Sequence, residues 1–180
     1  MHDDIERVLI DQAVIERRLD RMAEQILADF PDDPLVAIVL LKGALVFAAD
    51  LLRRIPRALE IECLNVASYH GGTESSGRVD FLDREFPVVV GRPVLLLDDI
   101  LDTGRTLAAV AARLHEEGAR EVRKGVLLAK QKARQADVSA DYVGFEIGDE
   151  FVVGYGLDFQ GRYRNLPFVG VLRHEVICPP

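Results

Sequence analysis

Short runs of branched apolar residues alternate along the chain with segments of helical periodicity, and this alternation restricts the fold more than any other feature. The clearest run is Leu35–Leu41 (LVAIVLL), which lies between Pro34 and the pair Lys42-Gly43. A continuous apolar run of this length indicates a strand buried on both faces of a sheet. Further strands are predicted for residues 60–68, 94–97, 121–129, 142–147, 151–153 and 168–172.

The segments between these strands carry helix signals. Residues 15–26 place apolar side chains at helical spacing, and Asp11 stands where an N-cap is expected. Residues 44–52 are apolar nearly all round, which predicts a buried helix. A third helix is predicted over residues 107–114, with Gly118 at its C-terminal cap.

Strands that alternate with helices predict an α/β fold. We expect a mostly parallel, twisted sheet with helices on both faces, formed by residues 1–180 as a single domain. Ligands of such sheets bind beyond the carboxyl ends of the strands. The loops that begin at Lys42, Ser68, Asp98 and Lys130 should therefore gather at one edge, where the functional site is expected.

The net charge excludes several classes of function. With 22 Lys and Arg against 30 Asp and Glu the net charge is −8, which disfavours binding to nucleic acid or to anionic membranes. Cys63 and Cys178 follow no metal-ligand spacing. Residues 1–4 do not resemble the start of a signal peptide, and the longest apolar run is too short to cross a bilayer. We therefore expect a cytoplasmic protein.

The strongest chemical signal is the segment PVLLLDDILDTGRT, residues 93–106. An apolar strand leads into Asp98, Asp99 and then Asp102, and Thr103-Gly104-Arg105-Thr106 follow at the start of a helix. That turn suits a phosphate monoester, because glycine lets the backbone approach, the amides converge and the helix N-terminus is partly positive. Adjacent carboxylates suit a sugar diol or hydrated Mg²⁺. A phosphorylated sugar is the ligand that needs both.

The alternative is an ordinary polar strand end followed by a helix cap. Three carboxylates within five residues make this alternative costly, because they repel one another unless a cation or a ligand is bound. The spacing does not fit a response regulator or a dehalogenase-type phosphatase, and the chain has neither a Walker loop nor a GxGxxG sequence. The pattern therefore favours the sugar-phosphate site.

The segment LLLDDILDTGRT resembles the loop that binds 5-phosphoribosyl-1-pyrophosphate (PRPP) in the type I phosphoribosyltransferase family. The resemblance extends in the right order over residues 41–43, 68–69, 127–130, 149–158 and 162–167. The run DEFVVGYGLD narrows it to the 6-oxopurine branch, the hypoxanthine-guanine phosphoribosyltransferases. One departure is visible: Asp98 stands where the family usually has Glu, so Asp99 matches the family better.

The resemblance implies a fold and a reaction. The fold would be the type I phosphoribosyltransferase fold, with a small hood region from the chain termini. The protein would be a Mg²⁺-dependent glycosyltransferase (pentosyltransferase) of purine salvage and nucleotide biosynthesis. It would transfer the phosphoribosyl group of PRPP to hypoxanthine or guanine, giving IMP or GMP and pyrophosphate. A cytoplasmic homodimer or homotetramer is expected, with no nucleic-acid or membrane partner.

The resemblance also implies roles for individual residues. Asp102 would accept the purine proton. PRPP would be bound by Lys42, Gly43, Asp98, Asp99, Asp102, Thr103, Gly104, Arg105, Thr106 and Arg164. The purine would be bound by Lys130, which donates to the 6-oxo group, and by Phe151, Val152 and Asp158. Asp98, Asp99 and Asp158 would contact the metal or its waters. Ser68 and Tyr69 would begin a lid formed by the Gly/Ser-rich loop 70–80, and a cis peptide bond would lie at Lys42-Gly43.

Ordinary structural alternatives stay open for these residues. Lys130 could be a surface lysine in a run of charges, Phe151 and Val152 could be core residues, and the loop after Ser68 could be a plain surface loop. At the level of function, one alternative is a PRPP-sensing regulator of the same fold that binds nucleic acid, but the chain offers no basic excess for it. A pyrimidine-specific enzyme of the same superfamily is another.

Overall fold

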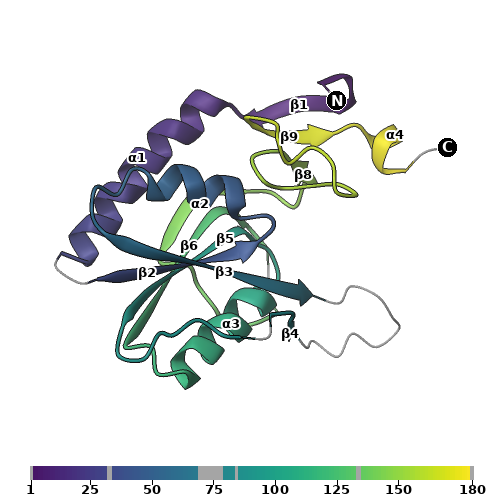
Figure 1. Ribbon diagram of the computed structural model, residues 1–180. Coiled ribbons are helices and arrows are strands. Elements are labelled where there is room, and N and C mark those ends of the chain that lie inside the picture. Colours follow the sequence, from purple (N-terminus) through teal and green to yellow (C-terminus); the bar gives the residue numbers. More distant parts are fainter. Residues whose placement is uncertain (1, 32–33, 69–78, 84, 133–134, 179–180) are drawn as a thin grey trace.

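The computed structural model describes residues 2–31, 34–68, 79–83, 85–132 and 135–178 (Figure 1). Its strands are β1 (Ile5–Ile10), β2 (Leu35–Leu41), β3 (Leu59–Ser68), β4 (Val79–Phe81), β5 (Pro93–Leu101), β6 (Glu121–Lys130), β7 (Tyr142–Ile147), β8 (Val152–Val153) and β9 (Val169–Leu172). Its α-helices are α1 (Gln12–Asp29), α2 (Leu45–Leu52), α3 (Arg105–Glu116) and α4 (His174–Ile177), and a 3₁₀ turn covers His2–Asp4.

The larger sheet has the strand order β4-β3-β2-β5-β6-β7. Strands β3, β2, β5, β6 and β7 are parallel, and β4 at the edge is antiparallel to β3. The predicted α/β fold with a mostly parallel sheet is therefore confirmed. Since parallel strands end at the same edge, the loops after β2, β5, β6 and β7 gather there.

Alternate residues of the central strands pack against helices on opposite faces. In β2, Leu35, Ala37 and Val39 belong to the apolar cluster that contains buried residues of α1 and α2. Val36, Ile38 and Leu40 belong to the cluster that contains the buried residues of α3. Figure 1 shows the same arrangement, with α1 and α2 on one side of the sheet and α3 on the other. Burial on both faces explains why the LVAIVLL run has no polar positions.

A second, three-stranded antiparallel sheet, the hood, has the order β1-β9-β8. Figure 1 shows it beside the larger sheet, where the purple N-terminal strand lies next to the yellow C-terminal strand. The predicted hood region from the chain termini is thus confirmed. Sequence reasoning did not find β1, because among its residues only Ile5 and Ile10 are buried and the usual alternation is missing.

Three local predictions were wrong in position. Strand β5 continues through Asp98 and Asp99 to Leu101 instead of ending at residue 97, because Asp98–Leu101 still pair with β6. The loop expected up to residue 80 ends earlier, since residues 79–81 form strand β4 against β3. The non-proline cis peptide joins Leu41 to Lys42, one bond before the Lys42-Gly43 peptide.

The helix ends agree with the sequence signals. The Asp11 carboxylate accepts a hydrogen bond from the backbone N–H of Val14 at 3.0 Å, which caps α1. Gly118 has φ +85° just beyond α3, the left-handed conformation that glycine adopts readily at a helix C-terminus. In the described part of the chain, no helix is long and apolar enough to span a membrane.

Replacing the N-cap residue tests the capping of α1. Asp11→Ala should lower the free energy of unfolding by about 1 kcal/mol, measured by urea denaturation, because the first turn loses its side-chain acceptor. The matched control is Glu24→Ala on the exposed face of the same helix, which should change stability by less than about 0.5 kcal/mol. Equal effects of the two substitutions would contradict a specific capping role for Asp11.

Candidate active site

The carboxyl end of β5 carries two neighbouring carboxylates. The backbone N–H of Asp99 donates to Asp98 Oδ1 at 2.9 Å. Burial and the charge of Asp99 raise the pKa of Asp98 well above its usual value. Burial also raises the pKa of Asp99, although hydrogen bonding and the positive charge of Arg164 partly oppose this effect. The pair therefore concentrates negative charge that a cation or a set of hydroxyl donors would stabilise.

Two glycines allow other chain segments to reach this pair. A Cβ added to Gly43 would fall on the carboxylate oxygen Asp99 Oδ2, well inside van der Waals contact. A Cβ added to Gly156, which has φ +106°, would in the same way overlap the carbonyl oxygen of Gly43. The end of β2, the end of β5 and the loop after β8 therefore meet at the Gly43 backbone.

The Tyr155 hydroxyl holds the loop after β8 in place. It donates to Asp50 Oδ2 of α2 at 2.6 Å, and the backbone N–H of Gly156 donates to the carbonyl of Arg164 at 2.9 Å. Burial, followed by the Asp50 contact, raises the pKa of Tyr155, so the hydroxyl stays a donor. This anchors the backbone that approaches Gly43.

The turn after β5 has the geometry expected of an anion site. Gly104 adopts φ +81° immediately before α3, whose 12 residues begin at Arg105. The backbone N–H of Arg105 lies 3.5 Å from Thr103 Oγ1. The carbonyl of Thr103 accepts from the backbone N–H groups of Gln135 and Ala136, at 3.0 and 3.2 Å. These hydrogen bonds hold the turn in place, and the first backbone N–H groups of α3 can donate to an anion.

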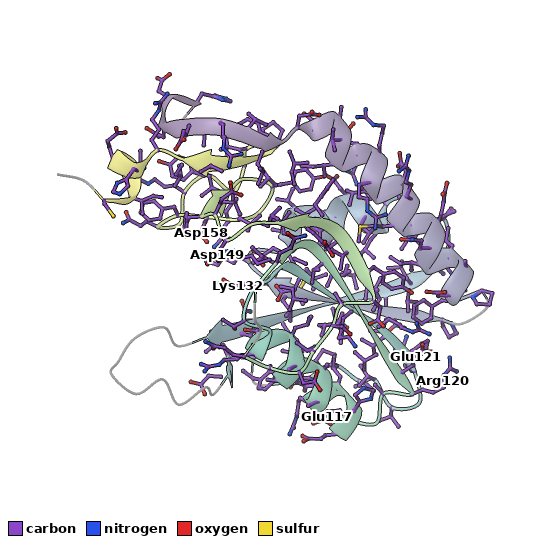
Figure 2. The ribbon with its side chains drawn as sticks, turned by 180° about the vertical axis from the view of Figure 1, so that it is seen from behind. Glu117, Arg120, Glu121, Lys132, Asp149 and Asp158 are labelled. Atoms are coloured by element: carbon purple, nitrogen blue, oxygen red, sulfur yellow. The ribbon has the colours of Figure 1, made fainter. Side chains whose placement is uncertain are left out.

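Four charged side chains form a ring beside this turn. Lys132 Nζ lies 2.5 Å from Asp102 Oδ1 and 2.9 Å from Asp149 Oδ1. Lys130 Nζ lies 3.1 Å from the same Asp149 oxygen and 3.7 Å from Asp102 Oδ2. Figure 2 places Lys132 and Asp149 near Asp158, far from Glu117, Arg120 and Glu121. Hydrogen bonds from Lys132 and Lys130 lower the pKa of Asp149.

Arg164 connects the hood to the acidic strand end. Its guanidinium pairs with Asp158 Oδ1 at 2.6 Å and donates to the carbonyl of Gly156 at 2.6 Å. Asp158 also accepts the backbone N–H of Gly161 at 2.7 Å. The positive charge of Arg164 also acts on Asp99, where it opposes the rise in pKa that burial causes.

The remaining predicted residues differ in their surroundings. Phe151 is 44% exposed and meets Phe159 edge to face, with ring centroids 5.6 Å apart, whereas Val152 is buried in β8. Lys42 is exposed just after the cis peptide. Ser68 ends β3, but Tyr69 and most of the predicted lid lie outside the described residues.

The carboxylates at this edge offer few direct ligands for Mg²⁺. No group of three His, Cys, Asp or Glu side chains in the described ranges is placed to hold a metal ion. Asp98 and Asp99 supply two adjacent carboxylates, and Asp158 is engaged with Arg164. This fits an ion held mainly by substrate phosphates and water, the usual manner of Mg²⁺.

Sequence reasoning missed three contributors to this site. Lys132 was given no role, and Asp149 and Gly156 were included only as members of the resembling run 149–158. A lysine two residues after Lys130 was a usable signal, because Lys130 ends β6 and Lys132 lies just beyond it. The positive φ of Gly156 was not readable from the sequence.

The fold and this edge are those of a phosphoribosyltransferase, and the Phosphoribosyl transferase domain family matches residues 8–160. The hypoxanthine-guanine phosphoribosyltransferase of Staphylococcus epidermidis is 43% identical over 176 residues, 98% of each chain. The chain belongs to the hypoxanthine-guanine phosphoribosyltransferase family, which confirms the resemblance found in the sequence.

Solved structures agree. A crystal structure of a hypoxanthine phosphoribosyltransferase from Staphylococcus aureus is 41% identical with a TM-score of 0.93, and the match covers 98% of this chain and 96% of that one. The hypoxanthine phosphoribosyl transferase of Trypanosoma cruzi is 34% identical with a TM-score of 0.91, with the same coverage of 98% and 96%. The type I phosphoribosyltransferase fold is thus confirmed.

A pair of glycine substitutions tests the contact between Gly43 and Gly156 of the loop after β8. Gly156→Ala should raise the KM for PRPP, because the new methyl group collides with the Gly43 carbonyl and displaces the end of β2. Gly91→Ala is the control, since Gly91 also has positive φ (+70°) but has no atom within 4 Å of an added Cβ. Both should lose about 1 kcal/mol of stability from backbone strain, but only Gly156→Ala should alter PRPP kinetics. Equal KM values for the two variants would exclude the proposed contact.

Proposed function

We propose that this protein transfers the 5-phosphoribosyl group of PRPP to a ring nitrogen of hypoxanthine or guanine, giving IMP or GMP and pyrophosphate. The proposal is carried by one edge of the sheet, which bears the acidic pair, the Thr103–Thr106 turn before α3 and the Asp102–Lys130 ion pair. The near full-length similarity to hypoxanthine-guanine phosphoribosyltransferases supports the purine assignment.

PRPP contains a phosphate monoester, a ribose and a pyrophosphate, and the edge offers partners for each. The amides and hydroxyls of Thr103–Thr106 would hold the 5-phosphate at the N-terminus of α3. Asp98 and Asp99 would accept hydrogen bonds from the ribose hydroxyls. The backbone at Lys42-Gly43 and the guanidinium of Arg164 would face the pyrophosphate, which leaves as the bond from the anomeric carbon to its oxygen breaks.

Mg²⁺ fits this arrangement as a cofactor. Asp98 and Asp99 would hold it together with phosphate oxygens and water, and Asp158 would contribute through a metal-bound water. When bound, the ion supplies charge neutralisation for the departing pyrophosphate. The residues of the chain orient the PRPP around it.

The purine would lie between Phe151 and the charged ring formed by Asp102, Lys130, Lys132 and Asp149. The exposed ring of Phe151 would stack on the base, the Val152 carbonyl and Asp158 would lie at its edge, and Lys130 would donate to the 6-oxo group. A site that donates to an oxygen rejects adenine, whose amino group is itself a donor. Asp102 would accept the ring proton as the new carbon–nitrogen bond forms.

Several finer features remain part of the proposal. A loop beginning at Ser68 and Tyr69 would close over the substrates, because excluding water protects an oxocarbenium-like state from hydrolysis. Residues 1–180 would act as one catalytic domain, in the cytoplasm, and as a homodimer or homotetramer. No observation on the described residues favours the nucleic-acid-binding regulator.

A direct assay tests the proposed function. The protein, mixed with PRPP, Mg²⁺ and one of hypoxanthine, guanine, adenine or uracil, should form nucleotide only with the first two bases, followed by absorbance or chromatography. Chelation of Mg²⁺ with EDTA should abolish product formation. No product from either 6-oxopurine would contradict the proposal, and product from uracil would favour the pyrimidine enzyme.

Substitution of Asp102 tests its role as proton acceptor. Asp102→Asn should lower kcat by about 10²- to 10⁴-fold, the usual contribution of a positioned general base, and should leave PRPP binding intact by calorimetry. Asp137→Asn, an exposed aspartate on the connection after β6, is a control with unchanged kinetics expected. A fully active Asp102→Asn variant would remove this residue as the base.

A further inference from the structure

The charged ring draws its members from the ends of three neighbouring strands. Asp102 follows β5, Lys130 and Lys132 come from the end of β6 and just beyond it, and Asp149 follows β7. Two cations and two anions face one another, so the ring is neutral as a unit. The distances are unequal, however, because Asp102 lies closer to Lys132 than to Lys130, at 2.5 against 3.7 Å.

The two oxygens of Asp102 have different surroundings. Oδ1 is buried, has no hydrogen-bond partner of good geometry within the described ranges, and is met by the Lys132 ammonium. The Asp102 side chain as a whole is 39% exposed, so its accessible surface lies outside Oδ1. Only Oδ2 is therefore placed to accept a proton from a bound base, and it faces Lys130.

Lys130 is the more buried lysine and has a different partner. Its side chain is 11% exposed, against 31% for Lys132, and its closest carboxylate is Asp149 at 3.1 Å. Since Coulomb attraction falls with distance, Lys132 contributes more than Lys130 to neutralising the charge of Asp102. Lys130 therefore keeps donor capacity for a ligand.

We propose that Lys132 is a positioning residue, which holds Asp102 Oδ1 so that Oδ2 faces the purine ring proton and Lys130 stays available to the 6-oxo group. The inference rests on the proposed function and extends it to a residue that touches no substrate itself. Without Lys132, Asp102 turns toward Lys130, and the proton acceptor and the 6-oxo donor pair with each other. The purine then loses both partners at once.

The proposal predicts an effect confined to the purine side of the reaction. Lys132→Gln should lower kcat/KM for hypoxanthine by about ten- to hundredfold, because misplacing a reacting group can cost about 10²-fold, with KM for PRPP unchanged. Lys132→Arg should keep most of the activity, because it restores a cation to Oδ1. Lys124→Gln removes another ion-paired lysine of β6, 3.3 Å from Asp141, and should match the unmodified protein.

A double-mutant cycle tests whether Lys132 acts through Asp102. Adding Lys132→Gln to Asp102→Asn should cost little beyond Asp102→Asn alone, since residues that act as a unit are not additive. Additive losses overturn the proposal, as does a Lys132→Gln variant with full activity, an equal rise in both KM values, or failure of Lys132→Arg to recover activity. Absence of activity in the unmodified protein contradicts the proposed function instead.

Discussion

The site depends on one close approach, that of the Gly43 backbone to the Asp99 carboxylate. Gly43 and Gly156 have no side chain, and a Cβ at either position would collide with its neighbour. The end of β2 can therefore contact the end of β5, while the loop after β8 contacts the Gly43 carbonyl. Three segments far apart in the sequence thus meet through the main chain of Gly43 and Gly156 and the carboxylate of Asp99. The Tyr155–Asp50 hydrogen bond and the Arg164–Gly156 contacts then hold the loop after β8 in this position.

Two groups of carboxylates share this edge, and their electrostatic states differ. Asp98 and Asp99 are adjacent and partly buried, and desolvation raises both pKa values, so an approaching cation or hydroxyl donor would stabilise the pair. Asp102 and Asp149 form ion pairs with Lys130 and Lys132 of the same chain. A bound cation or ligand would therefore stabilise Asp98 and Asp99, whereas Asp102 and Asp149 already have cationic partners in the protein. This difference agrees with metal and ribose contacts for the first pair and base contacts for the second.

The sequence predicted elements whose burial is uniform and missed those that depend on distant partners. The range Leu35–Leu41 was predicted with its observed bounds because both faces are apolar, and the Asp11 cap was readable from local hydrogen-bonding chemistry. Strand β5 was predicted too short, because the carboxylates at its end resemble a loop until their pairing with β6 is known. The Lys132–Asp102 contact joins different strand ends, and its charges resemble those of a solvated surface. The acidic pair and the Thr103–Thr106 turn were identifiable because their residues are contiguous. Gly43, Lys130 and Arg164 were given roles only through the family resemblance, and Lys132 and Gly156 were given no role.

The pairing of β1 with β9 in the hood affects the order in which the chain folds. Ile5 of β1 pairs with Leu172 of β9, so β1 stays without this partner until β9 has been synthesised. The strands β2, β3, β5 and β6 pair within the intervening chain, and their contacts do not require the C-terminal strand. Closing so large a loop is entropically costly and slow compared with local pairing. On a ribosome, the part of the site beside the Thr103–Thr106 turn can therefore form first, and the part beside the hood can form only after β9 has been synthesised.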